Sequence, residues 1–128
     1  MRALITFLFL TFALFVYSQR FYDASDRQVA RFDDNSVYNA SGKQIGRIDA
    51  ERIYDGSGHL IGRVDGNYYY DGSGHQIGRV DGNYLYSGSG KQIGRLDGDY
   101  LYDGSGHRIG RADGLRRMQI IIYFYYFY

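Results

Sequence analysis

Two charged residue types recur at a fixed spacing and are the first candidates for chemistry. Arginine and aspartate stand two residues apart, and the pair returns every sixteen residues. Residues two apart on a strand share a face, so this surface could grip carboxylates, phosphates or acidic glycans. Because each arginine has a matching aspartate, we interpret the pairs as structural ion pairs. The predicted pairs are Arg47 with Asp49, Arg63 with Asp65, Arg79 with Asp81, Arg95 with Asp97 and Arg111 with Asp113.

Tyrosine also recurs once every sixteen residues and supplies the candidate ligand contacts. These are Tyr54, Tyr70, Tyr86 and Tyr102. Aromatic faces at a regular spacing suit sugar rings or a protein partner. Core filling is the competing use, because a chain without tryptophan must pack another large side chain.

No residue set predicts catalysis, a metal or a cofactor. His59, His75 and His107 share one repeat position, but Arg27, Lys43 and Lys91 fill it in the other copies, and a metal site does not accept a basic side chain as ligand. The repeated serines lie in Asp-Gly-Ser-Gly segments without a distinct base and orienting group. The aspartates of these segments are too few for calcium and are expected to accept hydrogen bonds from their own turn amides. We therefore predict that the protein is not an enzyme.

These residues are positioned by a sixteen-residue repeat. Six copies run without a gap over residues 22–117, and they begin at Tyr22, Tyr38, Tyr54, Tyr70, Tyr86 and Tyr102. The eighth and eleventh positions are aliphatic in nearly every copy and are the predicted core. The ninth is glycine in five copies, where a bulge or bend would turn both apolar positions inward.

Turn residues divide each repeat into two strands. Asp-Gly-Ser-Gly precedes a longer strand and Asp-Gly-Asn follows it, and both favour tight turns between antiparallel strands. A short aromatic return strand then ends on the next tyrosine, which gives five complete hairpins and a variant sixth copy. The fold class is therefore all-β, with hairpins in a closed quasi-symmetric flower- or propeller-like ring or a short solenoid.

The N-terminal residues predict export. Residues 1–18 carry a charged start, a short apolar run and a small-residue end, as a secretory signal peptide does. Residues 19–128 then form a single domain in the periplasm, at the cell surface or outside the cell. Removal of Arg2 leaves 14 basic residues against 14 acidic ones, and this balance argues against binding of nucleic acid.

The C-terminal residues differ from the repeats. Residues 118–128 are β-branched and then aromatic, without a charge, and this composition predicts a strand buried on both faces. An alternative function follows from the same segment. Ile120–Tyr128 would span or dock to a membrane, or mediate self-association, if several chains pooled their tails.

The repeat Y-D-G-S-G-H-x-I-G-R-V-D-G, the leader and the aromatic tail together resemble the 5-fold β-flower proteins, small exported proteins of gut bacteria. The resemblance covers nearly the whole mature chain. It implies hairpin petals around an axis and brings no assigned activity or site residues. The toxin-shell YD repeats, MORN repeats and ice-binding solenoids are weaker resemblances. From the residues themselves we expect a structural or binding module, with a glycan or an envelope protein as the possible partner.

Overall fold

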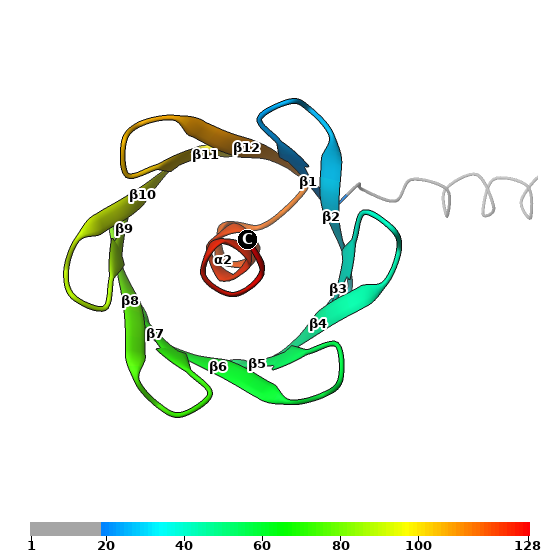
Figure 1. Cartoon of the computed structure of the whole chain (residues 1–128), viewed down its shortest axis with the longest axis horizontal. Helices are drawn as coiled ribbons and strands as arrows, with labels where there is room; N and C mark the ends of the chain where they lie inside the picture. The colour runs from blue at the N-terminus through cyan, green and yellow to red at the C-terminus, as the bar shows by residue number, and fades with distance from the viewer. Residues whose placement is uncertain (1–18) are drawn as a thin grey trace, which may run out of the picture.

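The structure is a computed structural model, and it describes residues 19–128. The predicted signal peptide, residues 1–18, lies outside the described residues. Twelve antiparallel strands close into a barrel around a short helix (Figure 1). The first strand, β1, pairs with the last strand, β12, with Arg20 opposite Asp113. The fold is therefore the closed all-β ring and not the open solenoid.

Short and long strands alternate around the ring. The short strands have four residues: β1 (Arg20–Asp23), β3 (Ser36–Asn39), β5 (Arg52–Asp55), β7 (Tyr68–Asp71), β9 (Tyr84–Ser87) and β11 (Tyr100–Asp103). The long strands have six residues: β2 (Gln28–Asp33), β4 (Gln44–Asp49), β6 (Leu60–Asp65), β8 (Gln76–Asp81), β10 (Gln92–Asp97) and β12 (Arg108–Asp113).

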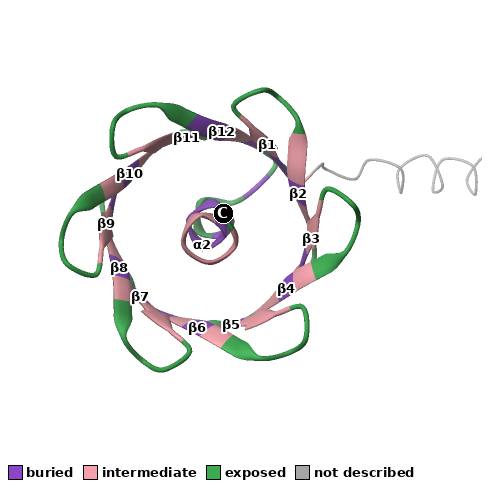
Figure 2. Ribbon diagram, in the orientation of Figure 1, coloured by how far each residue is buried: buried purple, intermediate pink, exposed green. Residues whose placement is uncertain are grey.

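Each petal of the ring is a short strand, an outward loop and a long strand. Six such petals are visible in Figure 1, and their loops are the exposed part of the molecule in Figure 2. The five hairpins expected from the sequence are the connections through the Asp-Gly-Asn type of turn, such as β8 to β9. The variant sixth copy closes the ring, because β12 pairs with β1 in place of a following return strand.

The petal loops are held by aspartate, as expected. In the β7–β8 loop, Asp71 Oδ1 accepts hydrogen bonds from the amides of Ser73 and His75, both at 2.9 Å. These backbone donors, that of His75 above all, lower the pKa of the Asp71 carboxyl. Gly74 closes the loop at φ +88°, a conformation that costs glycine little.

A bulge interrupts the ladder inside every petal. Across β9 and β10, Gln92 pairs with Tyr86 and Gly94 pairs with Leu85, so Ile93 is the extra residue. The predicted irregularity therefore exists, one residue before the expected glycine. Its effect also differs from the expectation, because the eighth position is only partly buried in most copies.

Three positions per repeat face the inside of the barrel. They are the ninth, the eleventh and the sixteenth, and the sixteenth lies in the middle of each short strand. Its residues are 0 to 2% exposed: Phe21, Val37, Ile53, Tyr69, Leu85 and Leu101. The prediction that the eleventh position belongs to the core is confirmed. The sixteenth position was not predicted, because its neighbours on both sides are tyrosines or polar residues that face outward.

The C-terminal segment is helical, so the strand predicted for residues 118–128 is wrong. It forms α2 (Arg117–Ile122) and a π-helical turn η1 (Tyr123–Phe127), which stand on the axis of the ring (Figure 1). A closed barrel has no free edge to pair with a further strand. A helix satisfies its own backbone inside an apolar lumen, which outweighs the strand preference of these side chains.

Successive residues of η1 face successive repeats. A β-carbon built on the ninth-position glycine would overlap the ring of Tyr126 at Gly62 and that of Tyr125 at Gly78. Phe127 lies against Gly46 in the same way, and Phe124 lies against Gly94 with a closest approach of 3.0 Å. Glycine is therefore required at Gly46, Gly62 and Gly78, because an aromatic side chain of the axis occupies the space that a β-carbon would need.

Candidate functional site

The outer wall of the ring carries an arginine stacked on a tyrosine in every repeat. The guanidinium carbon lies 4.1 to 4.5 Å from the ring centroid in all six cases. The pairs are Arg31 on Tyr38, Arg47 on Tyr54, Arg63 on Tyr70, Arg79 on Tyr86, Arg95 on Tyr102 and Arg111 on Tyr22. Cross-strand pairing produces this contact, since Arg79 stands opposite Tyr86.

This stacking changes the role of the predicted ligand contacts. Tyr54, Tyr70, Tyr86 and Tyr102 do lie on the outer wall, at intermediate exposure. One face of each ring is covered by a guanidinium, so these tyrosines hold the arginines in place and offer little open aromatic surface.

The predicted ion pairs are mostly present and weak. Arg47, Arg63, Arg79 and Arg95 lie 3.4 to 3.8 Å from the aspartate two residues on, and those aspartates are 66 to 74% exposed. Arg111 instead lies 3.7 Å from Asp26. Exposed pairs of this kind contribute about 0 to 1 kcal/mol, so the arginine charges remain available to a ligand.

Three tyrosines that the sequence reasoning missed are more exposed. Tyr68, Tyr84 and Tyr100 are 44, 44 and 40% exposed and lie on three successive short strands. Side chains alternate along a strand, so Tyr68 shares the outer face with Tyr70 while Tyr69 points into the core. That alternation was the available signal, and the segment was instead treated as one undivided aromatic strand.

The three exposed tyrosines make the outer wall asymmetric. Each faces an arginine of the next strand: Tyr68 pairs with Arg79, Tyr84 with Arg95 and Tyr100 with Arg111. We call these six residues the tyrosine arc. The equivalent positions in the other half of the ring are Arg20, Ser36 and Arg52.

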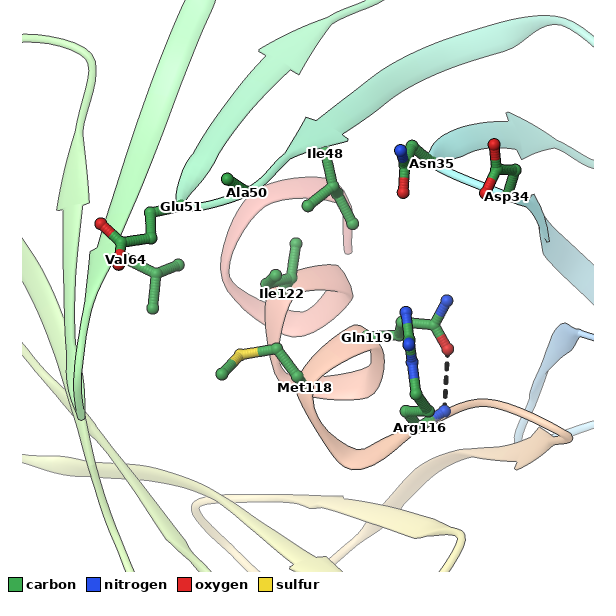
Figure 3. A pocket seen from close by; sticks show the side chains of 10 residues that line it. All are labelled: Asp34, Asn35, Ile48, Ala50, Glu51, Val64, Arg116, Met118, Gln119 and Ile122. Carbon is green, nitrogen blue, oxygen red and sulfur yellow. Dashed lines mark hydrogen bonds between the residues drawn. The ribbon is translucent and has the colours of Figure 1, made fainter.

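A second feature lies at the mouth of the barrel, on the side of the Asp-Gly-Asn turns. A pocket of about 440 Å³ lies between α2 and the wall from β3 to β6 (Figure 3). Its apolar side is formed by Ile48, Val64 and Ile122, and charged side chains stand around it. The volume is in the range of small-molecule sites.

A further hollow of about 440 Å³ lies on the other side of Met118, against Tyr69 and Ile121. The Tyr69 hydroxyl donates to Met118 Sδ at 3.5 Å. Arg117 donates to the carbonyl of Gly82 and, at 3.2 Å, to Asn83 Oδ1, which fixes the start of the helix to one side of the mouth. The two hollows therefore lie between the start of the axial helix and the wall, one on each side of Met118.

We also compared these two features with the side-chain clusters that hold metal ions. Within residues 19–128, no cluster of three or more His, Cys, Asp or Glu side chains gathers at metal-binding distance. The histidines lie in the petal loops, where His59 Nδ1 is 3.4 Å from Asp55 and its side chain is 80% exposed. In the same described part of the chain, no helix has the length and apolar character to cross a membrane.

Comparisons with known proteins give one match. A family model described as "5-fold beta-flower protein" matches residues 18–128. Curated proteins and solved structures give no match.

Proposed function

We propose that this chain, which belongs to the 5-fold β-flower family, is an exported, non-catalytic module that binds an acidic glycan of the cell envelope or its surroundings. The observation that supports the proposal is the tyrosine arc. Three exposed aromatic side chains, each beside an arginine, stand in a row on one half of the ring.

The chemistry of the arc suits a sugar polymer with acidic groups. Exposed tyrosine offers an apolar face and a hydroxyl, and arginine offers a planar cation for carboxylate or sulfate. The tyrosines are two strands apart, which is about 9.5 Å along the wall. A linear polymer that contacts all three would gain affinity from repeated weak contacts.

The residue pattern of the first eighteen positions supports export. The absence of catalysis is supported by the symmetric recurrence of the loop serines and of all three histidines, which leaves no distinct catalytic group. The alternative function, docking or self-association through the tail, rested on an exposed apolar strand. Ile120, Ile121 and Ile122 are 1 to 3% exposed inside the ring, so we do not carry that alternative further.

The test is calorimetric titration of the full chain with polygalacturonate, with neutral dextran as the comparison ligand. We expect saturable, salt-sensitive binding of the acidic polymer only. Replacing Tyr68, Tyr84 and Tyr100 together by alanine should weaken binding at least tenfold, because three contacts that act together on one polymer are removed at once.

The matched control is Ser36→Ala, at the same repeat position on the opposite half of the ring. It should leave the affinity unchanged, and Arg52→Tyr should raise it by extending the arc. Unchanged binding by the triple variant, or equal binding of dextran, would refute the proposed site.

A further inference from the structure

The mouth pocket contains a buried hydrogen-bond donor without a partner. Gln119 is 4% exposed, and its Oε1 accepts a hydrogen bond from the Arg116 amide at 2.8 Å. That bond fixes the side chain of Gln119, which lines the pocket, and leaves the amide nitrogen Nε2 as its other polar end (Figure 3). No hydrogen bond found within residues 19–128 has Nε2 as its donor. A buried amide without a partner is destabilising, and an acceptor on a ligand would remove that penalty.

Both acidic and basic side chains line the pocket. Figure 3 shows Glu51 on one side of the apolar side chains of Ile48 and Ile122 and Arg116 on the other, with Asp34 on the same side of the view as Arg116. Arg116 stands beside Gln119, so two donors face the same end of the pocket. None of these three charged residues forms an ion pair with another described residue.

The floor of the pocket is adaptable. Met118 separates the pocket from the second hollow, is 47% exposed and is held only by the Tyr69 hydroxyl among the hydrogen bonds of the described chain. Methionine is unbranched and polarizable, and it fits apolar side chains of different shapes.

From this arrangement we propose that the mouth pocket binds a short peptide of two or three residues with apolar side chains and free termini. The peptide carboxylate accepts from Gln119 Nε2 and pairs with Arg116. Its ammonium group pairs with Glu51 or Asp34, and its side chains cover Ile48, Val64 and Ile122. A simple anion is disfavoured by the two acidic residues, and a simple cation by the two donors.

The proposal concerns a different face of the ring from the tyrosine arc, and each can fail alone. The test is an NMR titration of the full chain with the dipeptide Leu-Leu. We expect saturable shifts of the Gln119 side-chain amide and of the Ile48 and Val64 methyl groups. N-acetyl-Leu-Leu, Leu-Leu-amide and decanoate should each bind at least tenfold more weakly, because each lacks one charge that the pocket matches.

One variant tests the Gln119 donor and a second serves as its control. Gln119→Glu keeps an oxygen that accepts from the Arg116 amide but removes the Nε2 donor, so it should weaken the binding of Leu-Leu at least tenfold. Arg27→Gln, in the β1–β2 loop, removes a charge far from the pocket and should have no effect. The unperturbed amide spectrum of each variant confirms its fold. The proposal is overturned if decanoate or a capped dipeptide binds as well as Leu-Leu, or if Leu-Leu shifts no pocket resonance.

Discussion

At the scale of single residues, the hydroxyl groups of η1 connect the axis to the wall. The Tyr125 hydroxyl donates to the carbonyl of Tyr86 at 2.8 Å and to that of Arg79 at 3.2 Å. The Tyr126 hydroxyl donates to the equivalent carbonyls sixteen residues earlier, those of Tyr70 at 2.7 Å and Arg63 at 3.3 Å. These bonds give the two tyrosines a fixed depth in the lumen.

Phe127 lacks this bond although its position is equivalent. It lies against Gly46, so the carbonyls of Arg47 and Tyr54 stand where a hydroxyl would reach them. We expect Phe127→Tyr to raise the free energy of unfolding by about 1 kcal/mol, the net value of one hydrogen bond, measured by urea denaturation. Tyr126→Phe, the reverse change one residue earlier, should lower it by a similar amount. A loss of stability in Phe127→Tyr would contradict the assumed equivalence of the repeats.

Residue chemistry was predicted from the sequence only where it depended on local spacing. The loop aspartates and most of the arginine–aspartate pairs follow from residues within four positions of one another, and the structure contains them. The stacking of Arg79 on Tyr86 and the exposure of Tyr68 depend on how strands pair and which face is inside. The closed ring fixes strand pairing and the inner face, so the sequence alone did not reveal them. The alternation of Tyr68, Tyr69 and Tyr70 showed only that Tyr68 and Tyr70 share one face.

At the scale of elements, the C-terminal helical segment formed by α2 and η1 fills the lumen and completes the hydrophobic core. Its residues Ile120 to Tyr123 are 1 to 5% exposed and meet all sides of the barrel. The strand prediction failed here because β-branched and aromatic side chains favour strands on average, and this average assumes an available sheet edge. The hairpins were predicted correctly because their turn residues act locally, whereas the axis is defined only after the ring has closed.

The buried tyrosines make the packing of this helix sensitive to alkaline pH. Burial raises the pKa of Tyr123, Tyr125 and Tyr126 to about 12, and it does the same for Tyr69 on the wall, which stacks on Tyr125 at 4.7 Å. Each folded-state pKa lies above the ordinary value of 10.0, so the folded protein holds these protons longer than the unfolded chain. Stability is therefore full below pH 10 and falls between pH 10 and 12.

Between pH 10 and 12 we expect the free energy of unfolding to fall by about 1.4 kcal/mol per pH unit for each of these tyrosines. Urea denaturation at a series of pH values measures this slope. Tyr126→Phe should make the slope shallower by roughly one quarter, because one of the four groups is gone. A stability that stays constant up to pH 12 would mean that these hydroxyls are not buried.

At the scale of the whole molecule, one axis residue corresponds to one repeat. Phe124, Tyr125, Tyr126 and Phe127 meet Gly94, Gly78, Gly62 and Gly46, so the order along η1 is the reverse of the order around the ring. The family description counts five folds, whereas this ring has six petals. The number of petals and the length of the aromatic tail therefore have to agree within one chain.

Deletion of one repeat tests that agreement. Removing residues 70–85 takes away Gly78 and leaves Tyr125 without its space in a smaller ring. We expect this variant to be strongly destabilised, and the additional deletion of Tyr125 to recover about 2 kcal/mol or more, because overpacking is relieved. Thermal unfolding compares the two, with deletion of Tyr125 alone in the six-petal ring as the control. If the deletion of residues 70–85 is as stable alone as it is together with the deletion of Tyr125, the number of aromatic residues in the tail does not have to equal the number of repeats that they contact.

The match between tail and ring has a consequence for how such genes change. A gene made of nearly identical units of sixteen codons gains or loses a unit whenever recombination misaligns its copies. Most repeat proteins tolerate this, because each unit contacts only its neighbours. Here the C-terminal segment packs against every repeat from the one with Gly46 to the one with Gly94. We therefore expect the tail to limit the number of copies: a gene with one unit too many or too few would encode a destabilised chain until the codons of its tail change as well.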